Sequence, residues 1–189
     1  MINLLDESLR RFLRGELGFS EDDVDVSFDA PDKDWAARVT RSTLNLFLWD
    51  VRRNLAEAES GSEIVVDAAG VKTRRPPLPK VDCRYLITAW TSDVTDEHEI
   101  LGDVLRVLLL NSTLREEYCE PAIAALRPLP SLRAALPDTK DTSDFWSALG
   151  GQLKPGLDLM VTAVVPAVPV LRVGKRVERR EIQATPLPD

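Results

Sequence analysis

The sequence predicts an α/β (α+β) fold, a single domain in which helices flank a mixed or antiparallel β-sheet. The first observation is composition: 189 residues, 44% of them hydrophobic and 29% charged, suit one soluble globular domain with a core. The second is pattern, because strand-like segments are interleaved with segments of helical periodicity. We find no internal repeat, and we expect residues 1–165 to form the domain and residues 166–189 an extended C-terminal arm.

The N-terminal segments predict a helix followed by a strand. Apolar residues three and four positions apart indicate a helix that ends near Gly15 or Gly18. These residues are Leu5, Leu9, Phe12 and Leu13. Alternation over residues 24–28 then predicts a half-buried strand. Residues 35–41 fit either a helical turn or a loop.

Residues 43–54 predict a strand that is apolar on both faces. The two faces are formed by Leu44, Leu46 and Leu48 and by Phe47 and Trp49. Such a strand is either covered on both faces or covered on one while the other meets a neighbouring subunit, where Trp49 would be the anchor. Residues 55–79 predict a solvated loop with a short hairpin, since they are rich in polar residues, Gly and Pro.

The C-terminal half predicts three strands and two helices. An apolar strand over residues 82–91 leads into a helix that begins at Thr95 and ends near Asn111, with acidic residues in its first turn. A short strand over residues 132–136 follows. A short helix is expected from Thr142 or Ser143 through Leu149, and a last core strand over residues 157–165.

The charge pattern disfavours nucleic acid and anionic membrane as partners. The chain has 24 basic and 31 acidic residues, a net charge of −7, and residues 1–70 alone contain 8 basic and 15 acidic side chains. No apolar run approaches the ~18 residues of a membrane span, and the first residues do not have the pattern of a signal peptide. Cys83 and Cys119 form no CxxC motif, so we expect a reducing cytoplasm.

The catalytic and metal-binding motifs that can be recognised in a sequence are missing. His98 is the only histidine, and neither a phosphate-binding loop nor a GxSxG motif occurs. We therefore expect no catalytic residue, no metal and no cofactor. Two function classes remain open beside a structural role: a small cytoplasmic protein-binding module, and a metal-independent hydrolase or transferase that uses scattered carboxylates.

Five segments occur in an order that is typical of one family. They are Leu46–Asn54, Tyr85–Trp90, His98–Arg106, Phe145–Gly151 and Leu153–Thr162. From about residue 4 to residue 165 the chain resembles the N-terminal domain of the tail-terminator (cap) proteins of phage-tail-like contractile injection systems, of the virulence-cassette and antifeeding-prophage type. Trp49 stands where a tyrosine is commoner in that family.

The resemblance implies a bacterial structural protein, not an enzyme, that closes the distal end of the inner tube and the contractile sheath as a hexameric ring. Its partners would be further copies of itself and the tube and sheath proteins. A ring needs a heterologous interface that closes, and the two-faced strand is our first candidate for it. The C-terminal arm is the second, because it is basic and has apolar residues that suit pairing along a sheet edge of an adjacent subunit or of the last sheath layer. A frayed terminus is the alternative. The candidate interface residues are Phe47, Trp49, Arg52, Arg53, Val168, Val170, Leu171, Arg172, Val173 and Arg176.

Overall fold

The computed structural model contains two β-sheets, which belong to two compact units of the chain. The first unit comprises Met1–Ala58 and Leu78–Ala167, and the second comprises Glu59–Pro77 and Val168–Asp189. Within them the structure describes residues 1–20, 23–58, 61–66, 70, 72–135, 146–147, 150, 153–166 and 171–172.

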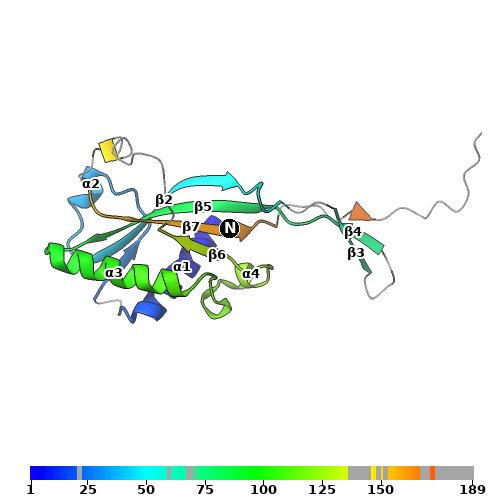
Figure 1. Ribbon diagram of the computed structural model, residues 1–189, viewed down its shortest axis with the longest axis horizontal. Coiled ribbons are helices and arrows are strands. Elements are labelled where there is room, and N and C mark those ends of the chain that lie inside the picture. Colours follow the sequence, from blue (N-terminus) through cyan, green and yellow to red (C-terminus); the bar gives the residue numbers. More distant parts are fainter. Residues whose placement is uncertain are drawn as a thin grey trace, which may run out of the picture. The chain divides into compact units, whose positions relative to one another are not determined.

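The first unit is built on a five-stranded mixed sheet with the strand order β1-β2-β5-β7-β6. β1 runs parallel to β2, and the other neighbours are antiparallel. The helices α1, α3 and α4 lie on one face of this sheet (Figure 1), which confirms the predicted fold class. Its elements are α1 (Ile2–Leu17), β1 (Asp25–Ser27), α2 (Lys33–Ala36), β2 (Thr43–Arg53), β5 (Lys80–Trp90), α3 (Val94–Leu110), the 3-10 helix η1 (Glu116–Tyr118), α4 (Pro121–Ala124), β6 (Ser131–Ala134) and β7 (Leu157–Val164).

The core lies between this sheet and the two long helices. Every second residue of the central strands faces it, as strand geometry requires, and the helices contribute residues three and four positions apart. Its buried side chains include Leu5, Leu9, Phe12 and Leu13 of α1, Val104 and Leu108 of α3, and Leu44, Leu46, Tyr85, Ile87, Leu159 and Val161 of the strands. The four α1 residues are those that the sequence pattern predicted.

Local signals set the ends of both long helices. α1 ends at Gly18, whose φ of 68° is left-handed and therefore suits glycine. α3 begins after Asp93, whose carboxylate accepts a hydrogen bond from the Thr95 N–H at 2.7 Å. At the other end of α3, the Asn111 side chain donates to the Val107 carbonyl at 2.9 Å. These capping contacts place the helix within one residue of the predicted bounds.

At each edge of the five-stranded sheet, some outward backbone groups form hydrogen bonds within the chain. At β1, the Asp25 N–H donates a hydrogen bond to the Ser42 carbonyl, so the N–H of the next residue, Val26, points away from the sheet. The Asp25 carboxylate accepts a hydrogen bond from this Val26 N–H at 2.8 Å. At β6, the Leu132 N–H donates to the Ser112 carbonyl at 2.8 Å, and Thr113 forms a bridge to Ser131. The backbone groups that could recruit a sixth strand are therefore occupied at these positions.

The second unit contains a three-stranded antiparallel sheet with the order β3-β4-β8. Its strands are β3 (Glu63–Val66), β4 (Lys72–Arg75) and β8 (Leu171–Arg172). The hairpin β3-β4 occupies the segment for which the sequence predicted a solvated loop with a short hairpin. The third strand could not be foreseen, because it comes from a segment about a hundred residues further along the chain.

Two other segments show where local prediction is incomplete. Residues 35–41 were ambiguous, and the structure forms a single helical turn, α2, capped by the Asp32 carboxylate on the Trp35 N–H. The strand predicted over residues 132–136 is wrong at its end: β6 stops at Ala134, because Ala135 has a φ of 52° and turns the chain. Most of the helix predicted up to Leu149 lies outside the described residues.

A buried polar pair joins α1 to the central strand β5. The Tyr85 hydroxyl, which is fully buried, donates to the Asp6 carboxylate at 2.7 Å. Burial raises the pKa of Asp6, and the Tyr85 hydrogen bond and nearby Arg10 offset only part of that effect. Burial also raises the pKa of the neighbouring Cys83 thiol to about 11. The ionised form of Asp6 is thus less favourable in the folded chain than in the unfolded chain.

This shift predicts the sign of a pH effect on stability. Because folded Asp6 holds its proton more tightly than unfolded Asp6, the wild type should gain stability relative to Asp6→Asn as the pH falls from about 7 to about 4. Calorimetric melting temperatures of both proteins across that range measure the difference. A difference that stays constant, or moves in favour of Asp6→Asn at low pH, would contradict the assignment.

Candidate interface surfaces

The face of the five-stranded sheet opposite α1 and α3, which we call the polar face, contains two of the predicted interface residues. Phe47 and Trp49 project from β2 on this face, and both are half-buried. At one end of the face, Trp35 of α2 packs edge-on against Trp90 of β5, with ring centroids 5.2 Å apart. The prediction that β2 is covered on its leucine face is confirmed, since Leu44 and Leu46 are fully buried.

Trp49 is part of a cluster within the chain. The register between β2 and β5 shifts between Leu48 and Asp50, which leaves Trp49 as the extra residue of a β-bulge. The Arg84 guanidinium lies over the Trp49 ring at 4.5 Å from its centroid and forms an ion pair with Asp158 of β7. Trp49 thus supports a charged pair in its own subunit, and a contact with a neighbour stays a prediction.

A hydrogen-bond network continues across the polar face beyond this cluster. The Asp82 carboxylate accepts hydrogen bonds from Asn54 at 3.0 Å and from the Thr162 hydroxyl at 2.6 Å. Arg133 of β6 donates to Thr162 at 3.1 Å and lies 3.3 Å from the Glu57 carboxylate. The network joins β5, β7 and β6 to the residues that follow β2, and it makes this face chemically unlike the apolar face beneath the helices.

The end of β2 presents the other two predicted residues of this strand. Arg52 and Arg53 are exposed, and Arg52 pairs with Asp50 at 2.7 Å. Beside them, Val51 is 45% exposed and Leu55 is 70% exposed. The structure therefore brings Arg52 and Arg53 together on one strand end with exposed apolar side chains, while Phe47 and Trp49 lie further back.

The predicted residues of the arm fall in the second unit. Leu171 and Arg172 form β8, which pairs antiparallel with β4 of the same chain. Val168, Val170, Val173 and Arg176 lie outside the described residues. The expectation that this segment pairs along a sheet edge agrees with β8, whereas the pairing with another subunit stays a prediction.

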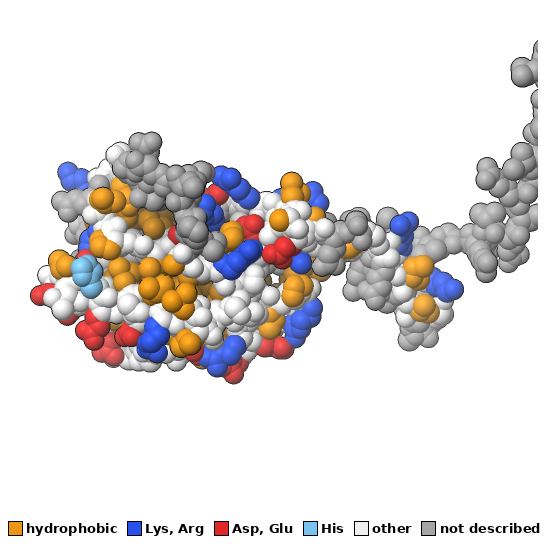
Figure 2. Space-filling model, viewed as in Figure 1, with side chains coloured by type: hydrophobic (Ala, Val, Ile, Leu, Met, Phe, Trp, Pro, Cys, Tyr) orange, Lys and Arg blue, Asp and Glu red, His pale blue; other side chains and the backbone are white. Residues whose placement is uncertain are grey.

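The sequence analysis missed a surface on α3. Val94, His98, Leu105 and Leu109 lie on one side of the helix, which we call the α3 stripe; Val94 is 64% and Leu109 is 66% exposed. Gly102 and the exposed Arg106 separate it from acidic residues further around the helix, which include Glu99 and Asp96. Figure 2 shows hydrophobic side chains along α3 next to the histidine, with acidic side chains below them. The available signal was the excess of apolar residues, more than one helix face can bury.

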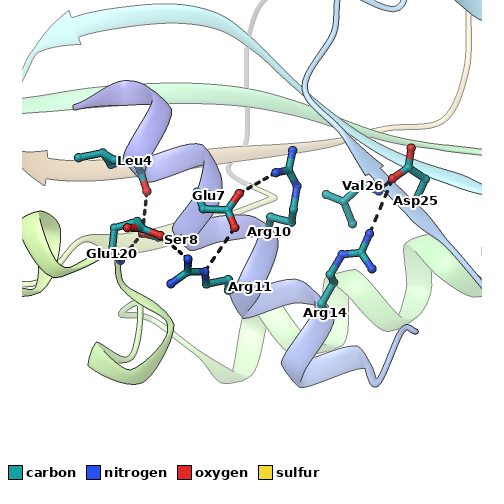
Figure 3. Close-up of polar contacts among 9 residues, drawn as sticks. All are labelled: Leu4, Glu7, Ser8, Arg10, Arg11, Arg14, Asp25, Val26 and Glu120. Carbon is teal, nitrogen blue, oxygen red and sulfur yellow. Dashed lines mark hydrogen bonds and ion pairs between the residues drawn. The ribbon is translucent and has the colours of Figure 1, made fainter. Parts of the chain in front are cut away.

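The arginines of α1, in contrast, are paired within the chain (Figure 3). Arg10 lies 2.6 Å from Glu7, Arg11 pairs with Glu120, and Arg14 lies 3.7 Å from Asp25 of β1. The contacts link α1 to β1 and to the residue that precedes α4. They stabilise the position of the helix, so we do not assign this surface to a partner.

The described residues contain neither a group of side chains that could hold a metal ion nor a helix that could span a membrane. Two open hollows border β1, with volumes of about 430 and 630 Å³, and both are lined by Asp25, Asp29 and Arg41. Among the residues that the structure describes, no group of three or more His, Cys, Asp or Glu side chains is arranged to hold a metal ion. In the same residues, no helix combines the length and the apolarity that crossing a bilayer requires.

Comparison with known proteins gives one family and several solved structures of similar fold, including the following two. Residues 4–179 match the Pvc16 N-terminal domain family. The sheath/tube terminator of the extracellular contractile injection system PVC, in its extended state, is 20% identical, with a TM-score of 0.69 over 99% of this chain and 65% of that chain. The anti-feeding prophage cap, which terminates the AFP tube, is 19% identical, with a TM-score of 0.65 over 95% of this chain and 60% of that chain. This chain thus spans less than two thirds of the length of either protein. No curated protein sequence matches it.

The Arg84–Asp158 pair allows a test of the polar face. The side chains of both residues are about four-fifths buried, so we expect a coupling of about 1–2 kcal/mol in a double-mutant cycle of Arg84→Gln and Asp158→Asn. The Asp50–Arg52 pair is the control: Arg52 is 64% exposed, and its cycle should give less than about 0.5 kcal/mol. Denaturant unfolding measures both, and equal couplings would contradict the account.

Proposed function

Because the chain belongs to the Pvc16 N-terminal domain family, we propose that it is a structural cap protein that terminates the inner tube and the sheath of a contractile injection particle. The observation that carries this proposal is the family match over residues 4–179. The likeness of fold to the PVC terminator, which extends over 99% of the chain, supports it. The cap role is favoured over the binding module and the hydrolase, since the solved structures named above are a terminator and a cap.

We further propose that six copies form a ring at the distal end of the particle, as the family resemblance implies. Neighbouring copies would meet through a heterologous interface that closes on itself. Each copy brings a net charge of −7, so repulsion opposes association at low ionic strength. A tube end that holds the copies together would offset this repulsion, which predicts weaker association in free solution than on the particle.

The role is proposed as non-catalytic, and its partners as further copies of the chain and the tube and sheath proteins. The particle would be assembled in the bacterial cytoplasm. We propose residues 1–165 as the terminator domain and residues 166–189 as an arm that acts in assembly. In the described part of the chain, β8 pairs with β4, so the opposite edge of β8 is where a strand of an adjacent subunit or of the last sheath layer would add.

Particle length tests the proposed function. Particles produced without this chain should contain tubes or sheaths of variable length, because nothing stops their growth, whereas complementation should restore a uniform length. Electron micrographs of purified particles measure both distributions. A uniform length without the chain would contradict the cap role.

Deletion of residues 166–189 tests the arm in the same assay. A deletion variant that keeps the melting temperature of the wild type but fails to restore uniform length would identify the arm as an assembly element. Full restoration of a uniform length would show that the arm is dispensable for length control and would contradict its proposed role in assembly.

A further inference from the structure

The second half of β2 has a neighbouring strand on one side only. β2 has 11 residues, and β5 pairs with it along its whole length. On the other side, β1 pairs only with Thr43, Leu44 and Asn45. In Figure 1, β2 runs on beside β5 beyond that short pairing. Among the described residues, no strand lies along the outer side of residues 48–53, which we call the free β2 edge.

The backbone groups of Val51 and Arg53 point away from the sheet at this edge. The Asn54 N–H donates to the Lys80 carbonyl of β5 at 2.9 Å, which fixes the direction of the preceding peptide groups. Since these groups alternate along a strand, Arg52 faces β5, whereas Val51 and Arg53 face outward. Within the described chain, neither outward residue forms a hydrogen bond on that side. Each therefore offers one donor and one acceptor to an added strand.

The side chains of the same two residues indicate what the added strand would contain. Val51 pairs with the buried Cys83, so Val51, and with it Arg53, lies on the sheet face that α1 covers further along. Val51 is 45% exposed, and Arg53 is exposed. Arg53 forms no ion pair with a described residue, whereas Arg52 on the opposite face pairs with Asp50. A complementary strand would place an apolar residue beside Val51 and a carboxylate beside Arg53.

A second copy of the chain does not supply such a strand. Its own free β2 edge would bring the same unpaired Arg53, and at β1 and β6 outward backbone groups already form hydrogen bonds within the chain. The other described strands with an outer edge, β3 and β8, belong to the second unit. That unit contains 8 basic and 6 acidic side chains, a net charge of +2. These charges favour a strand from a different protein.

We propose that the free β2 edge binds an extended segment of a different protein, with an apolar and an acidic residue two positions apart. The segment adds a strand to the five-stranded sheet. Six residues at about 3.3 Å each span about 20 Å, which is enough for a strand of ordinary length. Backbone hydrogen bonds supply the affinity, and Val51 and Arg53 supply the sequence preference. The proposal rests on the proposed cap role, in which the segment belongs to the uncapped particle end.

Hydrogen exchange of single amides tests the strand pairing. In the free chain, the amides of Val51 and Arg53 should exchange about tenfold faster or more than those of Arg52 and Asn54, which face β5. The chain is then bound to purified particles that were assembled without it, and exchange is followed by quenching and fragmentation mass spectrometry. Binding should slow the amides of Val51 and Arg53 about tenfold or more. Unchanged exchange of both amides in the bound chain would overturn the proposal.

Two variants of one residue separate the backbone contact from the side-chain contact. Val51→Pro removes the outward N–H but no hydrogen bond within the sheet, and proline is tolerated at a sheet edge. Its binding to the same particles, measured by cosedimentation, should weaken about tenfold or more, whereas Val51→Thr keeps the N–H and should bind within about threefold of the wild type. A folded Val51→Pro that binds as the wild type does would overturn the proposal. Circular dichroism reports folding, and if Val51→Pro is unfolded, hydrogen exchange of the wild type decides.

Arg53→Glu tests the acidic partner residue. It should weaken binding about tenfold, while the control Lys33→Glu makes the same charge change on the exposed surface of α2 and should bind normally. Equal binding of these two variants would contradict the charge assignment. Protection of Val51 and Arg53 that rises with concentration in the free chain would identify a second copy as the occupant and overturn the proposal. The cap role itself fails by a different result, a uniform particle length without the chain.

Discussion

The packing of α1 and α3 on one face of the five-stranded sheet is the constraint on which the rest of this structure depends, because it decides which face of each strand is buried. The Asp25 carboxylate accepts a hydrogen bond from the outward N–H of Val26, and residues 112–114 cover the start of β6, so backbone groups at these two positions are satisfied inside the first unit. The side-chain surfaces of this unit differ sharply in chemistry: the polar face, the strand end at Arg52 and Arg53, and the α3 stripe.

The second unit complements this arrangement. Its sheet has short strands, exposed apolar residues and a net charge opposite to that of the first unit. The first unit is well packed and acidic, and the second unit contains a small basic sheet. This combination suits a protein that folds on its own and forms further contacts with other copies or partners on assembly. The buried pair of Asp6 and Tyr85 illustrates the stability of the body, since a polar bond in a fully buried position fixes α1 against β5.

The sequence allowed prediction wherever local pattern decides the structure. The stripe of Leu5, Leu9, Phe12 and Leu13 predicted α1, and the two-faced pattern predicted β2, because periodicity and burial are directly linked. Pairing between distant segments could not be predicted from local pattern. β8 pairs with β4 across about a hundred residues, and the hydrogen bond between Asp82 and Thr162 joins residues that are 80 positions apart. The α3 stripe was missed for a related reason, since a helix that is apolar on several sides does not reveal which of them the core will bury. Of the candidate residues on β2, Arg52 and Arg53 are exposed, whereas Phe47 and Trp49 are half-buried and Trp49 stacks with Arg84.

A cryo-electron microscopy reconstruction of the distal end of the particle tests the central claim most directly. The account predicts density for this chain in a single ring of six copies at the last layer of tube and sheath, with the five-stranded sheet and its three helices recognisable in each copy. Density for the chain at the opposite end of the particle, along the sheath, or nowhere at the terminus would contradict it.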